Sequence, residues 1–258
     1  MLKEFFGWGG YERSAEGYMS WQHLTFVSSL MVIMIALAVV LGIRNRQKDL
    51  SVKNKVLIFS AIFIDGCELF KIVYLCFRNN NPWDWLYTLP LFLCSIQLIA
   101  IPLAAFSKGR LKEAALDFVF IFGILGAVLG TYGAGQNYSY YPVLSFDNVV
   151  SGITHTTAGF ASLYIVISGM ESMKKKNIPL TFCILFGFCI SAMIANAAVD
   201  YNYMFLRKGD GTPYDILYNL VGGNPILYPI LVIFLFLVYI AVFHLVYAFF
   251  KKDRKKNA

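Results

Sequence analysis

Apolar residues occur along this chain in seven long blocks, separated by short polar connections. The blocks cover approximately residues 24–43, 54–77, 86–106, 113–132, 148–169, 179–200 and 225–249. A helix needs about 20 apolar residues to cross the ~30 Å hydrocarbon core of a bilayer. The pattern therefore predicts an all-α, polytopic membrane protein with one bundle of seven transmembrane helices.

The predicted bundle, residues 23–250, is flanked by two short segments of different character. Residues 1–22 combine several aromatic residues with glycines and mixed charges, which is typical of a segment at the outer headgroup boundary. Residues 251–258 form a basic tail. The first twenty residues contain no apolar core before a small-residue cleavage site, so we expect no cleavable signal peptide.

The positions of the basic residues predict how the bundle is oriented. Only 14% of residues are charged, against about 25% in soluble domains, yet the net charge is +7. Sixteen of the 22 lysines and arginines fall in the connections after helices one, three and five and in the tail. Basic connections stay cytoplasmic, so we expect an extracytoplasmic N-terminus and a cytoplasmic C-terminus in the cell membrane. This distribution argues against a nucleic-acid partner.

The five cysteines all lie in apolar blocks, without Cys-x-x-Cys spacing or neighbouring ligand residues. This pattern predicts neither a disulfide framework nor a metal site. Most buried cysteines behave as small apolar side chains, and that interpretation stays open for each of them.

Under this topology, the polar residues within the membrane gather in its extracytoplasmic half. Ionisable residues at such depth cost about 2.5–3.5 kcal/mol each and almost always face the bundle interior or a wet cavity. Glu68 and Lys71 also have the spacing of an ion pair, so mutual neutralisation could explain both. The outer group comprises His23, Asp65, Glu68, Lys71, Cys94, Gln97, His155, Asn196 and Asp200.

Within this group, Cys94 and His155 form the candidate catalytic pair. Each lies about eight residues, or ~12 Å of helix, below the outer end of its predicted span. A desolvated thiol is a poor nucleophile until a partner takes its proton, and imidazole is suited to that role. Pro90 should splay the turn above the thiol.

Five other residues are candidates for supporting the pair. Glu68 or Asp65 could orient the histidine, whereas Lys71, Gln97 or Asn196 could donate hydrogen bonds to an oxyanion or a headgroup phosphate. His23, at the outer end of helix one, either belongs to this site or faces headgroups and water. Acyl transfer through a thioester needs no metal or other cofactor, so we expect none.

Two segments and the lone histidine of helix five carry a resemblance to a known family. Leu89-Pro90-Leu91-Phe92-Leu93-Cys94-Ser95-Ile96, His155 and Asn202-Tyr203-Met204-Phe205-Leu206 resemble the YwaF-like bacterial membrane proteins. These are related to a vertebrate transmembrane acyltransferase of ether phospholipids, and the fold looks like that of the androgen-induced fatty-acid ester hydrolases. The resemblance implies a catalytic pair at Cys94 and His155, and it adds Asn202 to the supporting residues.

Two functional hypotheses follow. The first is a lipid acyltransferase or acyl-ester hydrolase that acts on membrane phospholipids or fatty-acyl esters through Cys94 and His155, with no obligatory protein partner. The alternative is a non-enzymatic membrane protein that binds or transports a lipid or small solute in the same polar cavity.

Overall fold

The computed structural model describes residues 2–256, and this part of the chain is helical and contains no β-strand. In chain order its elements are α1 (Leu2–Phe6), α2 (Trp21–Asn45), α3 (Leu50–Arg78), η1 (Asp84–Tyr87), α4 (Gln97–Phe106), α5 (Gly109–Thr131), α6 (Gly135–Tyr140), α7 (Phe146–Ser168), η2 (Lys175–Asn177), α8 (Ile178–Val199), η3 (Tyr203–Phe205), α9 (Asp215–Leu220) and α10 (Leu227–Lys256).

Five stretches of the described chain are long and apolar enough to cross a membrane. They are α2, the Gly109–Tyr140 stretch that begins with α5, α7, the Lys175–Val199 stretch that contains α8, and Leu227–Phe250 of α10. The 29-residue α3 is long enough as well, but it carries Asp65, Glu68 and Lys71. The fold is therefore all-helical with several candidate membrane spans.

We expected one continuous transmembrane helix over the apolar block at 86–106, and this expectation is wrong. Only its second half is an α-helix, the ten-residue α4, and residues 88–96 form an irregular segment after η1. Pro90 explains the break, because proline has no N–H for the helical ladder and disfavours helical backbone at the residue before it. Cys94 thus lies in the turn that leads into a half-helix, and not inside a helix.

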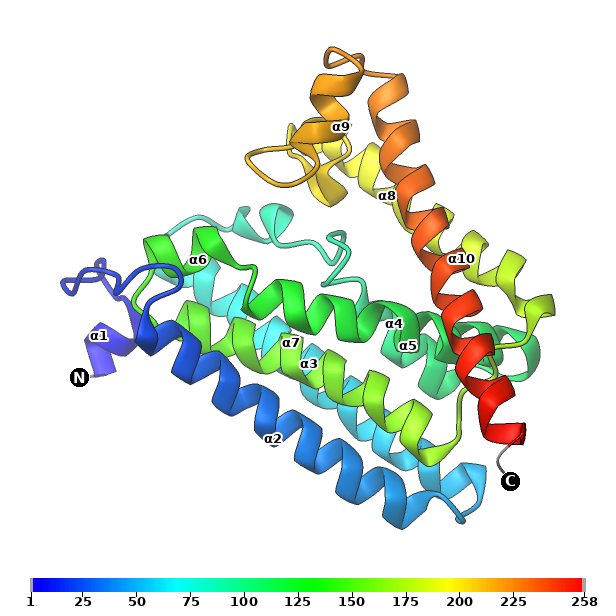
Figure 1. The fold of residues 1–258 in the computed structure, drawn as a ribbon. Helices are drawn as coiled ribbons and strands as arrows, with labels where there is room; N and C mark the ends of the chain where they lie inside the picture. Colours follow the sequence, from blue (N-terminus) through cyan, green and yellow to red (C-terminus); the bar gives the residue numbers. More distant parts are fainter. Residues whose placement is uncertain (1, 257–258) are drawn as a thin grey trace.

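Helix α5 occupies the centre of the fold and is buried along most of its length. It packs against α7 at small residues: Gly123 faces Ala158 and Ser162, and Gly159 faces Ala127. Figure 1 shows α2, α3, α4, α5 and α7 as one layered bundle, with α8 and α10 as an arm that meets it on one side. Part of that junction is a hydrogen bond of 3.0 Å from the Tyr239 hydroxyl on α10 to the Ile121 carbonyl.

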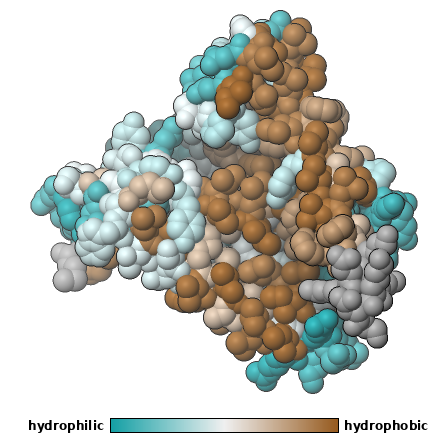
Figure 2. All heavy atoms as spheres, in the orientation of Figure 1, coloured by the Kyte–Doolittle hydropathy of each residue, from teal (hydrophilic) through white to brown (hydrophobic). Residues whose placement is uncertain are grey.

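The surface of the bundle is apolar around its middle and polar at its ends. Figure 2 shows this distribution on one face of the molecule. Large apolar side chains are strongly exposed on α2, α3 and α10, including Val32, Phe59 and Phe234. Such exposure is expected where lipid, and not water, surrounds the helices.

The N-terminal segment folds over one end of the bundle, against α3 and α7. Arg78, at the end of α3, donates to both carboxylate oxygens of Asp147 at the start of α7. The Tyr11 hydroxyl donates to the same carboxylate, and burial is the main reason why the pKa of Tyr11 is raised. The expected basic tail at 251–258 lies outside the residues whose side chains are described.

The connection at 132–147 covers the same end and contains the short α6. Its backbone accepts hydrogen bonds from the Tyr18 hydroxyl and from the side-chain amide of Asn148. The carboxylate of Glu16 accepts the Val143 N–H at 2.7 Å. The connection is therefore tied both to the N-terminal segment and to α7.

Candidate functional site

Cys94 lies in a helical turn that is fixed by its neighbour. The hydroxyl of Ser95 accepts the Phe92 N–H at 3.0 Å and donates to the Phe92 carbonyl at 3.1 Å. The Ile96 N–H bonds the Phe92 carbonyl at 2.9 Å, so this turn leads directly into α4. The thiol therefore lies at the positive end of the α4 dipole, where negative charge is stabilised.

The Cys94 thiol, in the turn before α4, and the His155 imidazole of α7 are hydrogen-bonded to each other. The second contact of the imidazole defines its tautomer. His155 Nδ1 is 2.7 Å from the Ser151 carbonyl oxygen, which can only accept, so Nδ1 carries the proton. Nε2 is then the nitrogen that is left to accept the proton of the thiol, as a general base requires.

Two glycines of α5 make room for this pair. A Cβ added at Gly126 would be 3.3 Å from the Cys94 Cα, and one added at Gly130 would overlap His155 Cδ2 and Nε2. The two glycines are four residues apart and so share one face of α5. Such spacing is typical of close helix packing, and what packs against this face is the candidate pair itself.

The polar residues of α3 lie partly buried on the same side of the bundle. Lys71 Nζ is 2.5 Å from Glu68 Oε1, so the ion pair that the spacing suggested is present. Lys71 is also near enough for its charge to act on His155. We expected Glu68 or Asp65 to orient the imidazole, but the hydrogen bond comes from Ser151 instead, through the backbone of the preceding helical turn.

Two supporting candidates carry buried polar atoms without a hydrogen-bond partner among the described residues. They are Asp65, at Oδ1, and Gln97, at both Oε1 and Nε2. Gln97 is completely buried as the first residue of α4. Burying an amide without a partner costs roughly 1–3 kcal/mol, which makes Gln97 a candidate for contact with a ligand.

His23 has a structural explanation. Its Nδ1 accepts the Met19 N–H at 3.1 Å, and its Nε2 donates to the Thr131 carbonyl at 3.1 Å. Its ring lies 3.9 Å from that of Tyr138, centre to centre. Both ring nitrogens are engaged, so His23 joins α2 to the end of α5 and is not free to act as a base.

Asn196 holds Tyr203 at the bend after α8. The Asn196 side chain pairs with both the N–H and the carbonyl of Tyr203. The Tyr203 hydroxyl in turn donates to the Leu86 carbonyl and accepts the Leu89 N–H at 3.2 Å. The ring of Phe92 packs 5.2 Å from that of Tyr203. The two segments that carry the family resemblance are therefore in contact.

Asn202 fixes the remainder of that bend. Its side chain accepts the Arg207 N–H and donates to Lys208 O and Asp210 Oδ2. Burial alone would raise the pKa of Asp210, but hydrogen bonds from Lys208 and Asn202 bring that pKa below its ordinary value. Asn196 thus positions the segment before Cys94 through Tyr203, whereas Asn202 holds the bend itself, and neither is hydrogen-bonded to the pair in the described structure.

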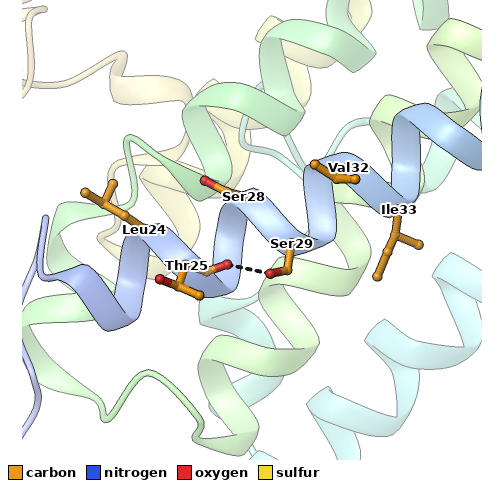
Figure 3. A pocket seen from close by; sticks show the side chains of 6 residues that line it. All are labelled: Leu24, Thr25, Ser28, Ser29, Val32 and Ile33. Carbon is orange, nitrogen blue, oxygen red and sulfur yellow. Dashed lines mark hydrogen bonds between the residues drawn. The ribbon is translucent and has the colours of Figure 1, made fainter.

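A shallow surface hollow on the outward face of α2 lies away from this chemistry, and its volume is about 640 Å³. Figure 3 shows the side chains that line it, with the Ser29 hydroxyl bonded to the Thr25 carbonyl. Its walls are Leu24, Thr25, Ser28, Ser29, Val32 and Ile33. None of these residues carries a base or an activated nucleophile, so we assign the hollow no catalytic role.

Sequence reasoning did not identify several residues that shape the site. Gly126 and Gly130 have a spacing typical of close helix packing, but nothing in that spacing indicates what lies opposite. Ser151 precedes His155 by one helical turn, a signal that could have been used. Tyr203 lies inside a segment that we singled out, although its hydrogen bonds to the distant residues Leu86 and Leu89 have no local signature.

Helices long enough to span a bilayer, and a thiol–imidazole pair packed against them, define a polytopic membrane protein with a candidate catalytic centre. The model of the TMEM164 family matches residues 18–252. Because this match covers nearly the whole chain, the protein belongs to the TMEM164 family. Comparison with the curated proteins and with the solved structures gives no match.

Proposed function

We propose that this protein is a membrane-embedded lipid acyltransferase or acyl-ester hydrolase. The observation that carries the proposal is the hydrogen-bonded Cys94–His155 pair, with Nδ1 of His155 held by Ser151. The resemblance to the vertebrate ether-phospholipid acyltransferase supports the same chemistry. The chain would cross the membrane seven times, with its N-terminus extracytoplasmic, so the pair would lie in the outer half.

In the first half-reaction, His155 Nε2 takes the proton of the Cys94 thiol as the sulfur attacks the carbonyl carbon of a lipid ester. The C–S bond forms and the carbonyl π electrons move to oxygen. When the tetrahedral intermediate collapses, the ester C–O bond breaks and His155 returns the proton to the leaving alcohol. The product is an acyl thioester on Cys94.

In the second half-reaction, an acceptor hydroxyl gives its proton to His155 and attacks the thioester carbon. The C–S bond breaks, and the thiolate of Cys94 recovers the proton from His155. An alcohol as acceptor gives transfer, and water gives hydrolysis. Both outcomes use the same residues, so the proposal covers both.

The direct test is to trap the thioester. Full-length protein in lipid nanodiscs is incubated with a phospholipid that carries a labelled acyl chain, and the label is then released with neutral hydroxylamine, which cleaves thioesters. We expect hydroxylamine-sensitive label on wild type, none on Cys94→Ala, and a loss of roughly 100-fold or more in its rate of formation for His155→Ala. A normally folded Cys94→Ala protein that is labelled as fast as wild type contradicts the proposal.

A second function, binding or movement of a lipid or small solute without catalysis, is favoured by the Glu68–Lys71 pair and the unpartnered atoms of Asp65 and Gln97. It predicts that Glu68→Gln abolishes binding, whereas Cys94→Ser leaves it unchanged. The acyltransferase proposal predicts a severe loss of turnover in Cys94→Ser. The same pair of variants therefore separates the two functions.

A further inference from the structure

The side chain of Gln97 is completely buried and has no hydrogen-bond partner among the described residues. Its side chain is 0% exposed, and neither amide atom has a partner in the described structure. The large majority of buried polar side-chain atoms are paired, so an unpaired amide next to a nucleophile requires an explanation. Gln97 follows Cys94 by three residues, which in a helical turn puts the two side chains on neighbouring positions of one face.

Two backbone N–H groups of the same turn also lie beside the Cys94 thiol. The N–H groups of Cys94 and Ser95 lie within hydrogen-bonding reach of the Cys94 sulfur. They are available because they precede α4, whose first turn leaves its N–H groups without helical partners. The Phe92 N–H, in contrast, is taken by the Ser95 hydroxyl. Two backbone donors beside the thiol and one unpaired side-chain amide a single turn away therefore occur together at the start of α4.

We propose that the Gln97 side-chain amide and the backbone N–H groups of Cys94 and Ser95 form an oxyanion site for a carboxylic ester. This inference rests on the proposed function. As the C–S bond forms, the ester carbonyl oxygen becomes negative and accepts hydrogen bonds from Gln97 Nε2 and the two N–H groups. When the ester C–O bond breaks, the carbonyl re-forms and these bonds weaken. Gln97 is then a catalytic residue, because it contacts the reacting oxygen.

The experiment compares two reactions of the same thiol. Acylation by 4-nitrophenyl butyrate passes through an oxyanion, whereas alkylation by iodoacetamide requires the thiolate but forms no oxyanion. Both rates are measured at Cys94 by mass spectrometry of its peptide, on full-length protein in nanodiscs. The variants are Gln97→Leu and Gln97→Glu, the second of which keeps the size of the side chain but has no amide donor.

We expect both variants to acylate roughly 100- to 1,000-fold more slowly than wild type, the usual effect of losing one oxyanion donor. We expect alkylation to remain within about twofold of wild type, because losing a donor to the oxyanion leaves the Cys94–His155 pair intact. His155→Ala should slow both reactions. A slowed acylation with unchanged alkylation in Gln97→Glu also shows that the variant is folded around its thiol.

Three different results would contradict either the proposed function or the oxyanion site. If wild type forms no acyl thioester at Cys94, the proposed function fails. If wild type forms it and both Gln97 variants form it equally fast, the oxyanion site fails while the proposed function stands. If acylation and alkylation fall together in both variants, Gln97 acts only through packing, and the oxyanion site is again overturned.

Discussion

Gly130→Ala is the change that most directly tests the geometry of the candidate pair. The added methyl group would overlap Cδ2 and Nε2 of the His155 ring. The ring cannot remain where it is, because overlap of this kind is not relieved by a shift of a few tenths of an ångström. Either the imidazole rotates away from Cys94 or α5 separates from α7, and both movements break the thiol–imidazole hydrogen bond.

The expected magnitude has two parts. Forcing a methyl group into a packed interior costs typically about 1–3 kcal/mol. Loss of the general base slows proton transfer by roughly 100- to 10,000-fold. Glycine to alanine within a helix otherwise stabilises by up to about 1 kcal/mol, so a decrease in stability cannot come from helix propensity.

The assay is alkylation of Cys94 by iodoacetamide in nanodiscs, followed on the peptide that contains it, together with the melting temperature. Gly66→Ala and Gly187→Ala are matched controls, because both glycines lie within helices and an added Cβ at either meets nothing within 4 Å. Gly130→Ala should react as slowly as His155→Ala, and the double variant no more slowly than either. A Gly130→Ala protein that reacts at the wild-type rate, or effects that add in the double variant, would refute this account.

Three further outcomes are expected. Tyr203→Phe removes a buried hydroxyl that bonds Leu86 and Leu89, so it should destabilise the protein by about 1–3 kcal/mol, measured by thermal unfolding. Tyr201→Phe is the control and should change stability little; the Tyr201 and Tyr203 ring centres are 4.8 Å apart. Asp117→Asn weakens the buried acceptor of the Ser172 and Met173 N–H groups and should speed proteolysis of that connection, whereas loss of the more exposed Glu113–Lys174 pair should leave proteolysis nearly unchanged. An impermeant thiol reagent should reach Cys94 from outside intact cells faster than from inside, and external accessibility of a C-terminal tag would contradict the orientation.

The helical character of the chain could be predicted because hydrophobic block length is a strong signal. Six of the seven apolar blocks coincide with long α-helices, and the block at 86–106 does not. Its composition is as apolar as that of the others, so block length alone could not reveal the break. Pro90 was the available signal. We interpreted it as a local kink, but the chain around it is not regular helix until Gln97.

The proximity of Cys94 and His155 was predicted from equal depth in two predicted spans, but their contact was not. Depth restricts two residues to one layer and leaves their rotation about each helix axis undetermined. Gly126 and Gly130 determine that rotation, because only the glycine face of α5 has space for both residues. A sequence pattern reports that glycines are spaced for close approach without identifying the side chain that approaches.

The supporting residues divide according to what kind of partner they need. His23 bonds the backbone of the distant Thr131, and Asn196 and Asn202 bond backbone groups of the irregular bend after α8; such groups carry no sequence signal. The partner of Lys71, in contrast, lies one turn away on the same helix, so local spacing was sufficient to predict it. Interactions within one helix were therefore predictable, and interactions between a side chain and backbone groups outside its own helix were not.

The broken helix gives the proposed chemistry a physical basis. In an unbroken span, the N–H groups of Cys94 and Ser95 would bond carbonyls of the preceding turn, and no donor would be available to a charge beside the thiol. The break frees these donors, but it also places irregular backbone at membrane depth, which is tolerated only when protein covers it. Tyr203 provides that cover by bonding Leu86 and Leu89. The bend after α8 would thus be a structural condition for a reactive thiol in the turn before α4, and Asn196 would influence the proposed reaction through Tyr203 without contacting the pair.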